Sequence, residues 1–256
     1  MLTSIPLLDP RALEKLREEE LEEARAIQGG MLPTEALHVG AVSVSHEFQP
    51  IAAVGGDFLD YFELPDGTIG LYLGDVSGKG LPAALYAALA VGTLRGVHKT
   101  GTPPSEVLAL LNRRLLLRGI PRRHAAIQYA VFDPQKRVMQ IASAGMVGPI
   151  HVTADGCRVL QLSGMPPGLF SSASYEDQSL ELKPGDWVLF CTDGLTDATD
   201  GFGEQFGMER LQTICATEPP ARPEEMLGRL FAAVDSFSAG CEQQDDMAAA
   251  LFHLRK

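Results

Sequence analysis

Paired cysteines, basic charge and long apolar runs are all scarce in this sequence, and each scarcity excludes a class of protein. The cysteines, Cys157, Cys191, Cys215 and Cys241, are widely spaced and form no Cys-x-x-Cys pair, so we expect reduced thiols rather than a zinc site or a disulfide framework. Basic residues number 21 against 33 acidic ones, a net charge of −12, which repels nucleic acid and anionic lipid. The longest apolar run, residues 81–94, is too short to span a bilayer. We therefore expect a cytoplasmic protein with no nucleic-acid or membrane partner.

A helix is predicted at the N-terminus, ahead of the main part of the chain. Asp9 followed by Pro10 is a good helix start, and Gly29-Gly30 marks its end. Five glutamates between residues 18 and 23 repel one another, and the apolar stripe is loose. The helix is either an ordinary packed helix with a solvated face or a connector that pairs two chains. We divide the sequence into a connector or regulatory helix at residues 1–30 and one domain at residues 31–256.

Short β-rich runs dominate the domain, and helical segments arrive in groups between them. Nine runs predict strands, at residues 41–48, 67–75, 125–133, 137–145, 148–154, 158–164, 178–183, 186–194 and 247–254. Helices are predicted at residues 81–99, 103–118, 206–215 and 223–236. This order predicts an α+β fold in which two antiparallel sheets pack face to face with helices outside, because strands and helices do not alternate strictly.

Carboxylates stand at the ends of the most apolar runs. Asp75 ends IGLYLGD and Asp193 ends WVLFCTD, and both are close to a glycine that lets other groups approach. Further candidates precede or follow other runs: Asp57, Asp60, Asp197, Asp245 and Asp246. Each Asp-Gly taken alone is also a common turn.

Convergence of several such carboxylates would require cations. Two like charges about 4 Å apart repel by roughly 4 kcal/mol at an effective dielectric constant near 20. A cluster of oxygen donors without His or Cys favours Mg²⁺ or Mn²⁺. A pair of such ions hydrolyses phosphate esters by activating a water and clamping phosphoryl oxygens.

The ordered motifs resemble a known family. VGGDFLD (residues 54–60), GDVSGKG (74–80) with the following PAAL, Asn112 in LLNRRL, TDGLTDATDGFGEQFG (192–207) and the terminal Asp-Asp look like the PPM-type metal-dependent serine/threonine phosphatases. Within them the sequence most resembles the SpoIIE-like bacterial sporulation and stress-response branch. The resemblance implies a β-sandwich flanked by helices that hydrolyses phosphoserine or phosphothreonine on a protein, with two Mn²⁺ or Mg²⁺ ions. In that branch the substrate is a phosphorylated anti-sigma factor antagonist.

The resemblance also implies roles for individual residues. Asp75 would bridge both metals, with the carbonyl of Val76 on one of them. Asp193 and Asp245 would hold one metal, and Asp57 would bind near the other. A metal-bridging water would attack phosphorus directly, so no side chain would be the nucleophile. The remaining aspartates would support the site: Asp60, Asp197 and Asp246.

Three places depart from the branch, and one lysine has two interpretations. Met146 stands where the branch usually has His, Ala248 where it usually has Thr, and GMPPGLF (residues 164–170) where it usually has a Pro-Leu-Gly step. These departures favour an alternative, a weakly active or inactive binding module of the same fold that acts through a partner protein. Lys79, between Gly78 and Gly80, is either a solvated lysine or a group that attracts a substrate phosphate at the start of the next helix. A nucleotide-binding enzyme that uses this glycine-rich turn is the most remote alternative.

Overall fold

Two antiparallel sheets face each other in the computed structural model, which describes residues 9–97, 99–117, 119–120, 123–217 and 222–256. One sheet has six strands in the order β1 (Leu37–Val39), β2 (Val42–Gln49), β11 (Met247–Leu254), β10 (Trp187–Cys191), β7 (Ile150–Thr153) and β8 (Gly156–Val159). The other has five, β3 (Phe58–Glu63), β4 (Ile69–Val76), β5 (Ala125–Asp133), β6 (Val138–Ala144) and β9 (Gln178–Glu181). The predicted fold class is confirmed.

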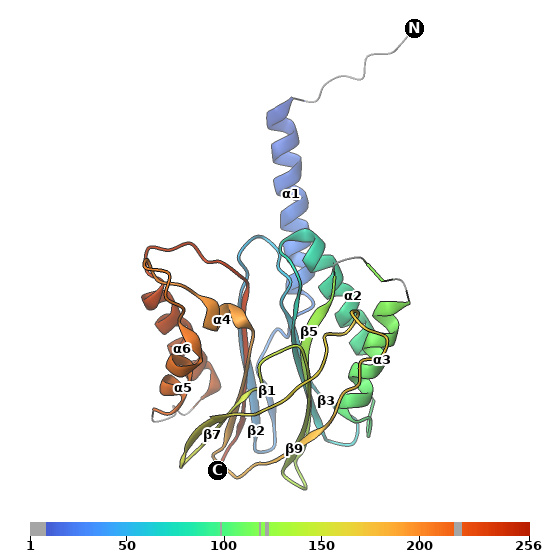
Figure 1. Ribbon diagram of the computed structural model, residues 1–256, viewed down its shortest axis with the longest axis vertical. Helices are drawn as coiled ribbons and strands as arrows, with labels where there is room; N and C mark the ends of the chain where they lie inside the picture. The colour runs from blue at the N-terminus through green and yellow to red at the C-terminus, as the bar shows by residue number, and fades with distance from the viewer. Residues whose placement is uncertain (1–8, 98, 118, 121–122, 218–221) are drawn as a thin grey trace.

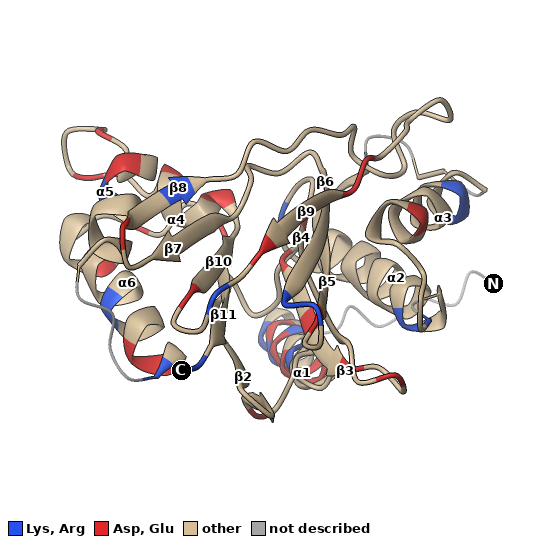
Figure 2. Ribbon diagram, turned by 90° about the horizontal axis from the view of Figure 1, so that it is seen from below, with Lys and Arg blue, Asp and Glu red and all other residues tan. Residues whose placement is uncertain are grey.

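Helices cover the outer face of each sheet. α2 (Leu81–Val97) and α3 (Pro104–Leu116) pack on the five-stranded sheet, and α5 (Gly207–Cys215) and α6 (Pro223–Phe237) pack on the six-stranded sheet. Figure 2 shows these two helical layers on opposite sides of the sandwich. The short helix α4 (Asp193–Asp197) follows β10 directly.

The core lies between the sheets. Phe132 of β5 and Phe252 of β11 meet there edge to face, with ring centroids 4.9 Å apart. Every residue of β11 is buried, because its inner face meets the other sheet and its outer face meets α6. This explains why the run MAAALFHL is apolar without alternation.

The N-terminal helix α1 (Pro10–Gly29) rises from one end of the sandwich and stands largely clear of it (Figure 1). It begins as the sequence predicts, with the Asp9 carboxylate accepting a hydrogen bond from the Arg11 N–H. Leu13 and Leu16 are each about half exposed. None of the described helices is both long and apolar enough to cross a bilayer.

The strand predictions were wrong in three places. The described chain has eleven strands rather than nine, because β1 and β3 were not predicted. β1 is only three residues long. In β3 a carboxylate, Asp60, interrupts the apolar run, and Arg95 of α2 neutralises it across 2.8 Å. The strand predicted at residues 158–164 is instead β8, which ends at Val159.

Helix predictions were closer to the structure. α2, α3, α5 and α6 each lie within two residues of a predicted helix at both ends. The predicted extensions to residues 98 and 118 fall on positions outside the described residues, as do residues 1–8 of the predicted connector. The single-turn helix α4 was not predicted.

Candidate functional site

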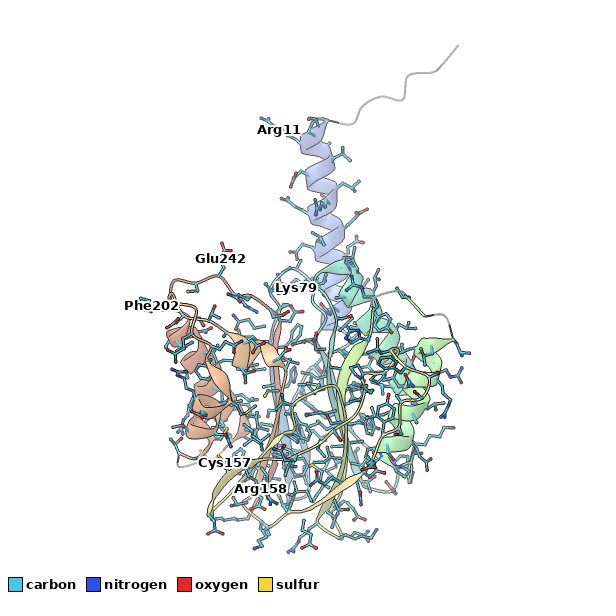
Figure 3. The ribbon with its side chains drawn as sticks, viewed as in Figure 1. Arg11, Lys79, Cys157, Arg158, Phe202 and Glu242 are labelled. Carbon is cyan, nitrogen blue, oxygen red and sulfur yellow. The ribbon has the colours of Figure 1, made fainter. Side chains whose placement is uncertain are left out.

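Antiparallel pairing brings the predicted carboxylates to one end of the sandwich. The start of β3 lies beside the end of β4, with Phe58 opposite Gly74, so Asp57 comes next to Asp75. The end of β10 lies beside the start of β11, with Cys191 opposite Ala249. Asp193 and Asp245 therefore meet at the rim of the other sheet. Lys79, labelled in Figure 3, marks this end of the molecule.

The carboxylates are close enough to perturb one another. Burial and then the charge of Asp75 raise the pKa of Asp57 well above its usual range. Burial, followed by the charges of Asp193 and Asp245, raises the pKa of Asp75 to about 6. The pKa of Asp193 is also raised, by burial and by the charges of Asp197 and Asp245. Carboxylates that destabilise one another in this way favour either protons or metal cations.

A threonine that the sequence analysis did not single out as a supporting residue orients Asp57. The Thr192 hydroxyl donates to the Asp57 carboxylate at 2.7 Å and accepts from the Ala248 N–H at 3.0 Å. Thr192 and Asp57 are both almost fully buried. Ala248 is one of the three departures from the branch. Its backbone N–H donates to Thr192, while its side chain packs in the core.

Two glycines allow the chain segments of the site to approach closely. A β-carbon on Gly56 would lie 2.8 Å from the Val76 carbonyl oxygen and 3.4 Å from a carboxylate oxygen of Asp75. A β-carbon on Gly194 would overlap the Asp246 carbonyl. Any side chain at either position would therefore separate the segments that carry the predicted ligands.

The turn before Asp57 is held from two directions. The buried Asp246 carboxylate accepts from the N–H groups of Ile51 at 2.9 Å and Gly56 at 2.6 Å. Gln28, at the end of α1, bonds to both backbone groups of Gly55: its amide donates to the Gly55 carbonyl at 2.7 Å and accepts from the Gly55 N–H at 3.0 Å. Asp246 therefore supports the loop, and α1 is tied directly to it.

Asp245 differs from the other predicted ligands because it has a cationic partner. Its carboxylate lies 3.3 Å from the Lys79 ammonium, and the two side chains are 44% and 49% exposed. The Lys79 ammonium also donates to the Gln244 carbonyl. Lys79 is thus anchored rather than freely solvated.

The donor set fits a hard divalent cation. It consists of carboxylates and a backbone carbonyl, the ligands that Mg²⁺ and Mn²⁺ prefer. Three of the carboxylates, Asp57, Asp75 and Asp193, have raised pKa values that a bound cation would lower. Within the described ranges, no group of three His, Cys, Asp or Glu side chains is already arranged to hold an ion. Asp245 is turned to Lys79, so completing the site requires this side chain to exchange its partner.

Two of the supporting candidates lie outside this arrangement. Asp60 faces α2, where it pairs with Arg95 and accepts from the Tyr72 hydroxyl at 3.3 Å. Asp197 accepts from the Gln205 amide at 3.1 Å on the exposed side of α4. Asp60 therefore stabilises the fold, whereas the charge of Asp197 contributes to the raised pKa of Asp193.

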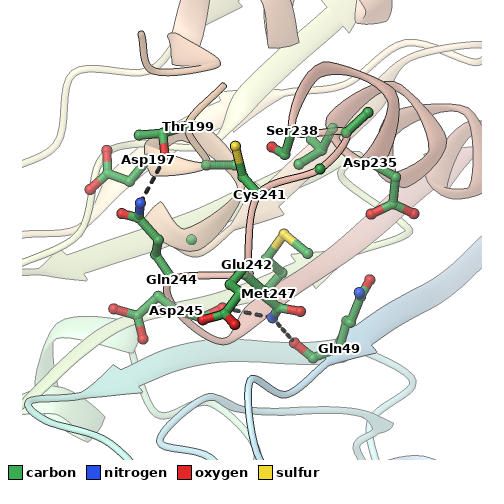
Figure 4. A pocket seen from close by; sticks show the side chains of 16 residues that line it. Gln49, Asp197, Thr199, Asp235, Ser238, Cys241, Glu242, Gln244, Asp245 and Met247 are labelled. Carbon is green, nitrogen blue, oxygen red and sulfur yellow. Dashed lines mark hydrogen bonds between the residues drawn. The ribbon is translucent and has the colours of Figure 1, made fainter. Parts of the chain in front are cut away.

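Helix α4 separates two cavities at this end of the molecule. One is lined by Asp75, Asp193 and Thr192 and, on the opposite wall, by Met146. The other lies between α4, the end of α6 and the segment before β11 (Figure 4). Asp245 borders this second cavity, whose lining includes the acidic residues Asp197, Asp235 and Glu242. The predicted ligands thus line two hollows rather than one.

A family model decides the identity of the domain. The model described as stage II sporulation protein E (SpoIIE) matches residues 65–255, well over half of the chain. The chain belongs to the SpoIIE family. The match includes Asp75, Asp193 and Asp245, while Asp57 lies just before it.

Relatives of this SpoIIE-type domain include characterised phosphatases and solved structures. Phosphoserine phosphatase RsbU of Bacillus subtilis (strain 168) is 28% identical over 210 residues, which cover 78% of this chain and 61% of RsbU. The chain spans between 37% and 61% of the length of the related proteins it matches. The SiaA-PP2C domain of Pseudomonas aeruginosa has the same fold, with a TM-score of 0.83 at 22% identity over 94% of this chain and 98% of that domain.

The family is metal-dependent, in agreement with the carboxylate donor set. RsbX, solved in complex with magnesium, shares the fold with a TM-score of 0.65 at 13% identity, covering 86% of this chain and 98% of RsbX. The predicted PPM-type, SpoIIE-like family and its two-sheet fold are thus confirmed. Which residues of this chain hold ions stays a prediction.

Proposed function

We propose that this chain is a protein phosphatase that hydrolyses phosphoserine or phosphothreonine with two Mn²⁺ or Mg²⁺ ions. The proposed ligands are Asp57, Asp75, Asp193, Asp245 and the backbone carbonyl of Val76. The observation that carries the proposal is that carboxylates from both sheets lie at one rim, where burial and the charges of neighbouring carboxylates raise the pKa values of Asp57 and Asp75. When bound, such ions supply an activated water and neutralise phosphoryl oxygens.

The side chains of the site favour water over a protein nucleophile. Burial raises the pKa of the Cys191 thiol to about 12, so the unreactive thiol form predominates at neutral pH. The Thr192 hydroxyl is already engaged by Asp57 and Ala248. In this account Asp75 lies at the centre of the ligand set, and Thr192 fixes the orientation of Asp57.

The substrate we propose is a phosphorylated protein of a bacterial signalling pathway, specifically an anti-sigma factor antagonist. Support comes from similarity to RsbU, whose name states that it is a phosphoserine phosphatase, and from resemblance to the stress-response branch. Both cavities open at the rim of the sandwich, where a residue of a folded partner can reach them.

Residues 1–30 are proposed to be a connector or regulatory helix for a phosphatase domain at residues 31–256. The contact between Gln28 and Gly55 supports this division of roles, because it joins α1 to the turn that precedes Asp57. Exposed Leu13 and Leu16, on a helix that stands away from the body, support pairing of α1 with a second copy of the chain.

A second candidate is a weakly active or inactive binding module. The observation in its favour is that Met146, an apolar side chain, lines the same cavity as Asp75 and Asp193. A thioether offers this cavity neither the proton donor nor the strong ligand that an imidazole would provide.

Hydrolysis of an aryl phosphate during a Mn²⁺ titration from zero to millimolar tests the choice between these functions. We expect activity that rises with Mn²⁺ in the unmodified protein and is lost in Asp193→Asn. Asp155→Asn is the matched control, because Asp155 is exposed in the turn between β7 and β8, away from the ligand set. A folded protein without activity at any Mn²⁺ concentration would support the binding module. Met146→His would then be tested for a gain of activity.

A further inference from the structure

Lys79 lies on a turn that is fastened to the body of the protein. The turn joins β4 to α2, and Gly78 and Gly80 on either side of the lysine have φ angles of +93° and +68°, which favour glycine. Ser77 bonds to His124 twice: its N–H donates to the His124 carbonyl, and its hydroxyl accepts from the His124 N–H, both at 3.1 Å. Arg123 donates to the Ser77 carbonyl as well. The backbone therefore presents Lys79 in a fixed position, while its long side chain can move.

The Lys79 ammonium contacts Asp245, which is also a proposed metal ligand. It pairs with Asp245 at 3.3 Å and donates to the Gln244 carbonyl. Among the ion pairs of the described residues, this is the one that involves a member of the proposed ligand set. An ammonium and a divalent cation repel each other, so they cannot both remain close to one carboxylate at low cost.

We propose that Lys79 is an exchangeable counter-ion of the site and, once displaced from Asp245, a positioning residue for the substrate phosphate. Without a divalent cation, Lys79 neutralises Asp245. When Asp245 turns to a cation, the ammonium is released beside the N-terminus of α2, where the helix dipole also favours an anion. The inference rests on the proposed phosphatase function and assigns Lys79 a part in it.

If Lys79 has both roles, removal of its charge should change Mn²⁺ affinity and phosphate affinity in opposite directions. Lys79→Met should bind Mn²⁺ about threefold more tightly in calorimetry without substrate, because a competing and partly exposed ion pair is lost. The same variant, saturated with Mn²⁺, should bind inorganic phosphate about tenfold more weakly, because a charge-assisted hydrogen bond is lost. Lys79→Arg should restore most of the phosphate affinity. If Lys79 had only a structural role, Lys79→Met would weaken both Mn²⁺ binding and phosphate binding, or neither.

Lys183→Met is the matched control because it removes the same charge at a different site. Lys183 is exposed in the segment between β9 and β10. We expect both affinities of this variant to equal those of the unmodified protein. Mn²⁺ affinity in Lys79→Met that is unchanged or weaker, or phosphate affinity that is unchanged, would overturn the inference. Failure of the unmodified protein to bind Mn²⁺ and hydrolyse aryl phosphate would instead overturn the proposed function itself.

Discussion

Strand β10 is flanked by an aspartate at each of its two ends, and the environments of these two aspartates are opposites. At its start, Asp186 accepts from the Lys183 N–H and faces His151 Nε2, both at 3.0 Å. At its end, Asp193 lies near Asp57 and Asp75, where burial and then neighbouring charges, including that of Asp193, raise the pKa values of both. The first end satisfies its carboxylate within the protein, and the second leaves carboxylates facing carboxylates. Such an arrangement costs stability, which indicates a site for cations rather than a structural element.

Loss of one central carboxylate should have the largest effect on activity. Asp75→Asn removes the proposed ligand that lies between the two sheets, and we expect Mn²⁺-dependent hydrolysis to fall by at least about 10³-fold, equivalent to several kcal/mol of transition-state stabilisation. Initial rates with an aryl phosphate at saturating Mn²⁺ measure the effect. If Asp75→Asn retained a tenth of the activity, Asp75 would not be the central ligand.

The metal-free protein should lose stability as pH rises. The pKa of Asp75 in the folded state, about 6, exceeds its usual value of 3.8, so the folded state binds this proton more tightly than the unfolded state. The contribution is complete below about pH 4 and is lost as pH rises through 6, on the order of 2–3 kcal/mol. Urea unfolding in a chelator at pH 4.5 and 7.5 should show this loss in the unmodified protein and a smaller one in Asp75→Asn. Equal losses of stability in the two proteins would contradict the raised pKa of Asp75.

Thr192→Val should weaken turnover without removing a ligand. Asp57 loses its hydroxyl donor and the Ala248 N–H loses its acceptor, so we expect a roughly 10- to 30-fold lower kcat together with a loss of about 1–2 kcal/mol of stability. Thr192→Ser keeps the hydroxyl and is the matched control. The prediction fails if valine and serine give the same kcat.

Gln28→Leu should uncouple α1 from the turn before Asp57. Both hydrogen bonds to Gly55 are lost in a buried position, and we expect a several-fold lower kcat at subsaturating Mn²⁺ and about 1–3 kcal/mol less stability. Gln28→Glu retains the acceptor alone and should be intermediate. If Gln28→Leu left the steady-state kinetics unchanged, α1 would have no effect on the site through this contact.

Disruption of the contact between Asp186 and His151, at the start of β10, should lower stability and leave activity unchanged. Asp186→Asn weakens the contact with His151, and we expect the melting temperature to fall by about 3–6 °C. Activity per folded molecule should stay unchanged, because β10 separates this pair from the carboxylate set. A parallel loss of kcat would break the distinction between the two ends.

The sequence predicted the parts of this architecture that depend on local pattern. Apolar runs ending in Asp75 and Asp193 predicted two strands that each place a carboxylate at the rim of a sheet. β3 was missed because the cost of its interior Asp60 is offset by Arg95, 35 positions away. Thr192 and Gln28 were not recognised as supporting residues, since their roles depend on contacts with distant backbone groups. The partner of Lys79 could not be inferred for the same reason.

Calorimetric titration of Mn²⁺ into the substrate-free protein, with Asp75→Asn alongside, tests the central claim most directly. The account predicts saturable binding in the unmodified protein and a loss of at least about tenfold in affinity when this carboxylate is neutralised. Absence of binding up to millimolar Mn²⁺ in a folded sample, or equal binding by both proteins, would contradict it.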